Sequence, residues 1–343
     1  MTSYVILANP GHNRIYFESA ITTAELELSA IMSRFNLEPQ FTACKIEGMP
    51  HNICFETKTE IDDEALKYIA ASSVCYAMFK IEVGGLLKPI KLPSFQIFDD
   101  SINTILRYKG KTNEQFTRLM LNLALVACKT KSSRKKLLDP MCGKGTTLYE
   151  GLSRGMDVIG VETNSTWFSE MTTYIVKYLQ MGKFKHKATK SKRTINGKKT
   201  ADEMTVITAP TKADFDAKNT YSFEVFHSDT RICDTLIKKN SCDIIVSDLP
   251  YGVQHASKSK NGATEELCRS PYSLLEEALP AWKAVLKQGG AIALSFNEYT
   301  LHYNDVANLL EKNGFHVLRE KPFYGYQHRV DQSIVRDIVV AYA

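Results

Sequence analysis

Residues 138–147 read LDPMCGKGTT and mark the place where a short apolar strand gives way to a helix. Asp139 ends the strand, Gly143 and Gly145 form a tight turn, and Thr146 begins the helix. In an open α/β sheet, ligands bind outside the carboxyl ends of the strands. Glycine lets a ligand approach the backbone closely. This stretch therefore predicts a nucleotide-type binding turn in a sheet of alternating strands and helices.

The pattern that follows this turn predicts a mostly parallel sheet. The next strand ends in Glu162, where dinucleotide-type folds place a carboxylate for the ribose. Apolar periodicity predicts helices at residues 113–128, 146–154, 167–179, 230–239, 273–286 and 304–312, and strands at residues 137–139, 157–162, 223–226, 243–247, 291–296, 316–320 and 335–341. The glycine pair at 289–290 is expected to end the helix 273–286. The last two strands have no helix between them, so we expect them to pair antiparallel. The fold class predicted is α/β, a seven-stranded mostly parallel Rossmann-like sheet with a C-terminal antiparallel hairpin, covered by helices on both faces.

The first part of the chain has a different pattern. Strand-like runs at residues 4–8, 53–56 and 76–83 alternate with helical patterns at residues 22–35 and 62–72, which indicates a small α+β domain. Residues 88–93, KPIKLP, favour an extended linker because each proline restricts the residue before it. We therefore expect a small N-terminal α+β domain over residues 1–95 and the larger α/β domain over residues 96–343.

Composition excludes several classes of protein. The chain has 343 residues, of which 44% are hydrophobic and 24% charged, as in soluble globular proteins. No apolar run approaches the ~18 residues that span a bilayer, and the N-terminus lacks a basic start and a small-residue cleavage site, so we interpret the protein as cytoplasmic. None of the eight cysteines forms a C-x-x-C pair, so we expect reduced buried thiols and no metal site. The oligomeric state is left open.

Positive charge is concentrated in two stretches of the larger domain. Residues 1–100 carry a net charge of −5, and residues 101–343 carry +10. Residues 101–136 hold nine basic residues and only Glu114 as an acid, and residues 171–201 hold nine basic residues and no acid. A polyanion partner explains this concentration, and a solvated face with a lysine-rich loop explains it equally well.

Residues 247–252, SDLPYG, follow the fourth strand and point to the chemistry. An exocyclic amine of a base is a poor nucleophile because its lone pair is delocalised into the ring. Asp248 and the carbonyl of Leu249 are placed to hold the two N–H groups of such an amine. Pro250 would stiffen the turn, and Tyr251 would stack on the base, which contributes ~1–3 kcal/mol. Catalysis at this turn would rest on positioning and electrostatics.

The third strand closes with another acid. Asp229 lies in the sequence HSDT at residues 227–230 and begins a helix. An aspartate at a helix start is commonly an N-cap, and a role in binding a cofactor at the sheet edge is the alternative. The sequence leaves both open.

Two motifs together resemble one family. The residues DPxCGxGT at 139–146 and DLPYG at 248–252 resemble the S-adenosylmethionine-dependent RNA guanine-N2 methyltransferases related to the THUMP-domain tRNA enzymes. Residues 110–124 are similar to the helix that precedes the glycine motif in that family. The resemblance implies a class I methyltransferase with S-adenosyl-L-methionine as cofactor, tRNA as partner and N2-methylguanosine as product.

The resemblance also implies a set of site residues. Asp229 would accept a hydrogen bond from the adenine amino group. The catalytic residues implied are Asp248, Leu249, Pro250 and Tyr251. The cofactor-binding residues implied are Phe116, Thr117, Asp139, Pro140, Cys142, Gly143, Gly145, Thr146, Glu162, Asp229 and Asp248.

The chain departs from this family before residue 95. Members usually carry a complete THUMP domain that docks the tRNA end, whereas the short N-terminal region here is net acidic. Residues 183–199, with Asn196-Gly197 as a hairpin turn signal, are a candidate replacement for docking RNA, and a surface hairpin without a partner is the other interpretation. A DNA adenine-N6, an rRNA guanine-N2 and a protein glutamine-N5 methyltransferase remain alternatives, as does a non-catalytic RNA-binding module.

Overall fold

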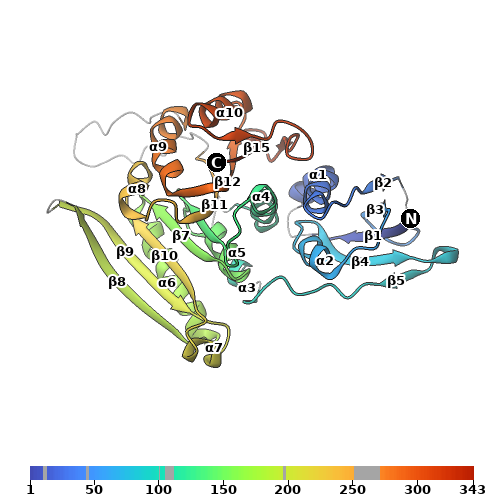
Figure 1. Ribbon diagram of the computed structural model, residues 1–343, viewed down its shortest axis with the longest axis horizontal. Coiled ribbons are helices and arrows are strands. Elements are labelled where there is room, and N and C mark those ends of the chain that lie inside the picture. Colours follow the sequence, from blue (N-terminus) through green and yellow to red (C-terminus); the bar gives the residue numbers. More distant parts are fainter. Residues whose placement is uncertain (11–13, 44–45, 100, 105–111, 196–197, 251–270) are drawn as a thin grey trace.

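The computed structural model describes residues 1–343 except 11–13, 44–45, 100, 105–111, 196–197 and 251–270. Its strands form two sheets (Figure 1). The smaller sheet lies within residues 2–89 and the larger one within residues 136–342. None of the helices in the described part of the chain has the length and apolar character that a membrane crossing requires.

The smaller sheet is antiparallel and has the strand order β2-β3-β1-β4-β5. Its strands are β1 (Thr2–Ala8), β2 (Gln40–Thr42), β3 (Asn52–Thr57), β4 (Cys75–Ile81) and β5 (Leu87–Pro89). Helices α1 (Arg14–Ser33) and α2 (Asp63–Ala70) accompany it, and Val83–Gly85 form a short 3-10 turn. The extended linker predicted at residues 88–93 therefore starts inside β5, because residues 87–89 pair with β4.

The larger sheet has the order β13-β15-β12-β11-β6-β7-β10-β9-β8, and β14 pairs with β15. Its strands are β6 (Lys136–Asp139), β7 (Asp157–Glu162), β8 (His186–Ile195), β9 (Lys198–Thr208), β10 (Tyr221–His227), β11 (Cys242–Asp248), β12 (Leu286–Asn297), β13 (His316–Val317), β14 (His328–Arg329) and β15 (Val335–Tyr342). The five strands from β12 to β10 are parallel, and β15 is antiparallel to β12 and β13. The predicted mostly parallel α/β sheet with a terminal antiparallel pair is confirmed.

Helices cover both faces of this sheet. On one face lie α4 (Glu114–Ala127), α5 (Thr146–Ser153) and α6 (Ser165–Met181). On the other lie α8 (Cys233–Leu236), α9 (Pro271–Val285) and α10 (Tyr303–Lys312). Shorter helical segments are α3 (Ser101–Thr104), α7 (Lys212–Asp216) and a 3-10 turn at Thr230–Ile232.

The described strands of the larger sheet number ten, whereas the sequence predicts seven. Two of the additional strands are β8 and β9, which extend the sheet beyond β10 (Figure 1). The apolar periodicity of β8 is weak because its residues 187–194 are all exposed, whereas β9 buries Ala201, Met204 and Val206. The third is β14, which is only two residues long.

Two predicted element boundaries are wrong. The glycine pair at 289–290 lies inside β12, where Gly289 has a φ of +74° and the pairing register with β11 shifts. Such a conformation suits a bulge, which glycine accommodates without strain. The helix predicted over residues 230–239 is a 3-10 turn and the short helix α8, because Ile237 turns extended and is buried in the core.

The cysteines in the described part of the chain divide into two groups. Cys75, Cys128, Cys142, Cys233 and Cys242 are free and buried, as expected of reduced thiols. Cys54 on β3 is disulfide-bonded, so the prediction that the thiols are reduced is wrong for this residue. The spacing of cysteines along the chain does not show which of them form a disulfide.

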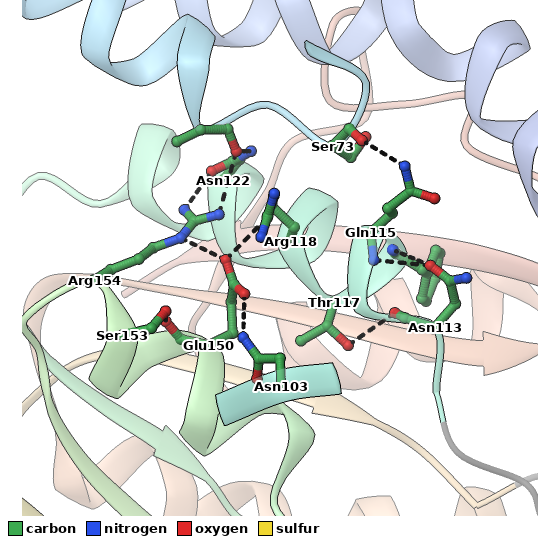
Figure 2. A network of polar contacts seen from close by, with 12 residues as sticks. Ser73, Asn103, Asn113, Gln115, Thr117, Arg118, Asn122, Glu150, Ser153 and Arg154 are labelled. Atoms are coloured by element: carbon green, nitrogen blue, oxygen red, sulfur yellow. Dashed lines mark hydrogen bonds and ion pairs between the residues drawn. The ribbon is translucent and has the colours of Figure 1, made fainter. Parts of the chain in front are cut away.

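One of two hydrophobic core clusters in the described residues includes both sheets, and a buried polar network joins them. Ile6 and Leu28 from the first part of the chain share a core with Phe116 and Leu119 of α4. Around α4, the network in Figure 2 links Asn122 to Arg154 and Arg154 to Glu150, and it joins Gln115 to Ser73. Glu27 of α1 connects Ser73 with Asn122. Helix α4, which carries two predicted site residues, is therefore held by both parts of the chain.

Candidate active site

Four acids lie at one edge of the larger sheet. Asp139, Glu162 and Asp248 are the last residues of β6, β7 and β11, and Asp229 follows β10. These strands are parallel, so their carboxyl ends meet at the same edge. The structure thus brings together the strand ends that the sequence marks as a ligand site.

The glycine turn after β6 is shaped by two left-handed residues. Gly143 has a φ of +54° and Gly145 a φ of +91°. A Cβ at Gly145 would lie 2.8 Å from Sδ of Met171, so this position requires glycine for packing. A Cβ at Gly143 would meet nothing within 4 Å, so the backbone there opens onto unfilled space. Buried Cys142 fixes the turn through its N–H, which donates to the Val161 carbonyl at 3.0 Å.

Glu162 faces this turn. Its Oε2 accepts a hydrogen bond from the Gly143 N–H at 2.9 Å, and its Oε1 accepts one from the Asn164 N–H at 2.6 Å. The side chain is buried, and burial raises the pKa of its carboxyl group. Each carboxylate oxygen has two lone pairs, so Glu162 has the acceptor capacity that ribose hydroxyls require.

Asp139 is buried between the turn and β11. Its Oδ1 accepts hydrogen bonds from Ser247 Oγ at 2.8 Å and from the Met141 N–H at 3.2 Å. Burial raises the pKa of Asp139 to about 7, although its hydrogen bonds oppose this shift. Pro140 follows it and is buried, and Thr146 begins α5 and is also buried.

Asp248 is held through both carboxylate oxygens. Its Oδ1 accepts from Ser295 Oγ at 2.8 Å, and its Oδ2 accepts from Thr112 Oγ1 at 2.7 Å. Arg336 forms an ion pair with the same Oδ2 at 3.3 Å. The orientation of this carboxylate is therefore set by three separate segments of the chain.

The turn after Asp248 begins in a fixed position. The Leu249 N–H donates to the Ser295 carbonyl at 2.8 Å, and the Leu249 side chain is buried. Pro250 is exposed. Tyr251, the fourth predicted catalytic residue, lies outside the described residues.

The start of α4 lies against Asp248 and Arg336. Asn113 caps this helix by accepting from the N–H groups of Gln115 and Phe116. Phe116 is fully buried, and the guanidinium of Arg336 lies 4.7 Å from the centre of its ring. Thr117 is also buried, and its hydroxyl donates to the Asn113 carbonyl. Phe116 thus supports the group that pairs with Asp248.

Asp229 is engaged with an arginine. Its carboxylate accepts from the Arg231 backbone N–H at 2.8 Å and pairs with the Arg231 guanidinium, which also contacts Glu277 on α9. The N-cap role is therefore observed. A contact from Asp229 to an adenine amino group stays a prediction.

The partners of Asp248 are not among the residues predicted from the sequence. Ser295 follows from strand pairing alone, because it lies opposite Asp248 in the register of β11 and β12. Thr112 and Arg336 carry no local signal, since only the tertiary fold brings them to β11. In the part of the chain that the structure describes, no cluster of His, Cys, Asp and Glu side chains could hold a metal ion.

Comparison with known proteins gives one family. A family model described as "RMKL-like, methyltransferase domain" matches residues 107–319, which is more than half of the chain. No curated protein was found to match the chain in sequence.

Solved structures with similarity include the rRNA methyltransferase aviRa from Streptomyces viridochromogenes. It is 13% identical, with a TM-score of 0.40, over 72% of this chain and 91% of that one. Another is a SAM dependent methyltransferase from Archaeoglobus fulgidus, 14% identical, with a TM-score of 0.37, over 67% of this chain and 95% of that one. The family match, together with the glycine turn and its carboxylates, leads to one conclusion. The chain belongs to the RMKL-like methyltransferase domain family and is an S-adenosylmethionine-dependent methyltransferase.

Proposed function

We propose that this protein methylates an exocyclic amine of RNA, with N2 of guanine in tRNA as the target. The observation that carries the proposal is the position of Asp248. It ends β11 beside the glycine turn, with its carboxylate fixed and the Leu249 carbonyl next in the chain. A charged acceptor and a carbonyl on adjacent residues match the two N–H groups of an amine.

The residues at the edge of the sheet fit the cofactor. The unfilled space at Gly143 admits a ligand to the backbone, and Glu162 beside it offers carboxylate oxygens to a ribose. When bound, S-adenosylmethionine supplies an electrophilic methyl group. Asp248 and Leu249 would orient the amine, and their fixed dipoles would favour the developing charge on nitrogen.

The alternatives differ in the molecule that is methylated. DNA adenine, rRNA guanine and protein glutamine present amine or amide groups to a similar turn. Transfer of labelled methyl groups to an unmodified tRNA transcript mixture, rRNA, DNA and protein in parallel, followed by nucleoside analysis, tests the proposal. Label in N2-methylguanosine of tRNA is the expected result, and label confined to DNA or protein would contradict it.

Binding of the cofactor is expected to depend on Glu162. Replacing Glu162 with Ala removes the acceptor for ribose and the partner of the Gly143 N–H, so the affinity for S-adenosylhomocysteine should fall by ~1–3 kcal/mol. Isothermal calorimetry measures this loss. Glu170→Ala is the matched control, because this acid on α6 is half-exposed and pairs with Lys144. Equal affinities of wild type and Glu162→Ala would remove Glu162 from the pocket.

We propose that residues 1–95 act as an accessory domain and that β8 docks the RNA. β8 is the outermost strand of the larger sheet, and it carries Lys187, Lys190 and Lys192 exposed to solvent. Arg193 is less suited to bind phosphate, because it pairs with Glu203 at 2.7 Å. The same holds for Arg118 in the first basic stretch, which pairs with buried Glu150. The lysines of β8 are thus better placed to contact phosphates.

Neutralising these lysines should weaken the salt dependence of RNA binding. Each phosphate contact that is lost lowers the slope of log K against log salt by about 1, so Lys187, Lys190 and Lys192→Gln together should lower it by about 2–3. Filter binding of tRNA across a salt series measures the slope. Lys238, Lys239 and Lys312→Gln remove the same charge from exposed positions elsewhere and should leave the slope near that of the wild type. Equal slopes in both triple variants would show that the lysines of β8 do not dock the RNA, and residues 1–95 would then be the next candidate for the docking surface.

A further inference from the structure

We propose that Arg336 is the positioning residue of the reaction, holding the Asp248 carboxylate in the orientation that accepts the amine. This inference rests on the proposed function of Asp248. It assigns to β15, at the far end of the chain, a role at the turn that follows β11.

Strand register places Arg336 beside the carboxylate. Ser295 on β12 lies opposite Asp248 on β11, and Arg336 on β15 lies opposite Asn297 on β12. Strand residues alternate between the two faces of a sheet. Residues two positions apart on a strand lie on the same face, so Asp248, Ser295 and Arg336 share the face of Val246, Ala293 and Ile338. The latter three are buried in the core under α4. The three side chains therefore meet on one face.

The guanidinium of Arg336 is itself held in place. Its side chain is 8% exposed, it pairs with Asp248 Oδ2 at 3.3 Å, and it lies over the Phe116 ring at 4.7 Å. His328 is its cross-strand neighbour on β14, and the His328 ring packs against Phe116 at 5.3 Å between ring centres. A planar, permanently charged group stacked on an aromatic ring has little freedom to move.

Arg336 brings positive charge to a site that contains two carboxylates. Asp139 and Asp248 are neighbouring carboxylates, and Asp139 is buried. A buried charge is costly unless it is paired. Thr112 and Ser295 are neutral donors that orient the carboxylate of Asp248, whereas Arg336 brings positive charge to it. A carboxylate that must accept an N–H needs both its charge and its direction.

The test is a double-mutant cycle between Arg336→Met and Asp248→Asn. Methionine keeps a long apolar side chain against Phe116 and removes the charge. In the wild-type background, Arg336→Met is expected to lower the single-turnover rate on the tRNA transcript mixture about 10²-fold, the scale of a small misplacement in an active site. In the Asp248→Asn background the same change should cost less than about threefold, because the partner charge is absent. Arg336→Lys should keep part of the rate.

Two readouts do not depend on turnover. Calorimetry should give the same affinity for S-adenosylhomocysteine in wild type and Arg336→Met, since Glu162 and the glycine turn are untouched. Urea unfolding of the four proteins of the cycle should show coupling between positions 248 and 336. Arg319→Met is the matched control, because Arg319 forms a half-exposed ion pair with Glu311.

The outcomes separate this inference from the function on which it rests. Equal losses of rate from Arg336→Met in both backgrounds would overturn the positioning role while leaving the methyltransferase assignment of Asp248 intact. Additive effects on unfolding would overturn it as well. A wild type that transfers no methyl group to RNA would contradict the proposed function, and this role with it.

Discussion

Asp248→Ala is expected to lower the single-turnover rate of methyl transfer about 10²–10³-fold, the usual effect of losing one positioned polar group in an active site. The reason is local. The carboxylate at the end of β11 is the acceptor that the amine needs, and alanine leaves Ser295, Thr112 and Arg336 without it. The glycine turn and Glu162 do not depend on Asp248, so the cofactor should still bind. Rapid-quench measurement of labelled methyl transfer at saturating RNA determines the rate.

Two further variants sharpen this result. Asp248→Asn keeps an acceptor oxygen and loses the charge, so it should retain part of the activity. Asp243→Asn is the matched control, because Asp243 lies at the other end of β11 and contacts Thr130, Ser132 and Lys287. A rate of Asp248→Ala within tenfold of wild type, with cofactor affinity preserved, would show that Asp248 is not the catalytic acceptor.

The predictable part of this site is the part that local sequence encodes. Asp139, Glu162 and Asp248 each end an apolar strand, and a strand followed by a turn and a helix can be recognised from periodicity. Parallel pairing then brings their carboxyl ends to one edge. Ser295 is at the limit of what can be predicted, since it requires the register of β11 against β12.

The unpredictable part depends on contacts between distant segments. Arg336 reaches Asp248 only because β15 runs antiparallel to β12 in a particular register. A role of Phe116 in binding the cofactor, which the resemblance implies, stays a prediction, and the contact of its ring with Arg336 could not be predicted from the sequence. The turn signal at residues 196–197 predicts a hairpin, and β8 does pair antiparallel with β9, but the two strands are absent from the predicted sheet for another reason. β8 is an edge strand whose residues 187–194 are all exposed, so it leaves no apolar alternation in the sequence. β9 buries Ala201, Met204 and Val206, but Glu203 and Thr208 are buried as well, which weakens its apolar alternation.

The predicted boundary near residue 95 is also affected by tertiary contacts. The two prolines there predict an extended linker between a small domain and a larger one. Across this boundary, Gln115 of α4 donates to the backbone carbonyls of Asn9 and Ser73, and Asn122 donates to Glu27 and the Ala71 carbonyl. Burial raises the pKa of Glu27, and the hydrogen bonds that Glu27 accepts from Ser73 and Asn122 oppose this rise. Polar contacts of this kind tie the two parts together, and they cannot be read from the pattern of either part.

At the centre of these contacts, Glu150→Gln is expected to destabilise the protein by about 3–5 kcal/mol, the usual cost of leaving a buried charge without its partner. Glu150 is 1% exposed and pairs with Arg118 at 3.1 Å and with Arg154 at 2.7 Å (Figure 2). Glutamine keeps the size of the side chain but leaves two buried guanidinium groups facing each other. Urea unfolding followed by circular dichroism measures the loss, and Glu311→Gln is the control, because its ion pair with Arg319 is half-exposed and such pairs contribute little.

The pH dependence of stability and the effect of a second substitution distinguish lost charge pairing from lost packing in the Glu150→Gln variant. Burial opposes the ionisation of Glu150, but Arg118 and Arg154 outweigh it and hold the pKa of this carboxyl group below its ordinary value of 4.5. A depressed pKa in the folded state stabilises the protein above the unfolded-state pKa, and this stabilisation is lost as the pH falls through the folded-state value. The difference between wild type and Glu150→Gln should therefore be full near pH 7 and shrink as the pH falls below 4.5. Adding Arg118→Met to Glu150→Gln removes one uncompensated charge and should restore part of the stability. A loss that is independent of pH, and that Arg118→Met deepens, would show that the network acts by packing rather than by charge.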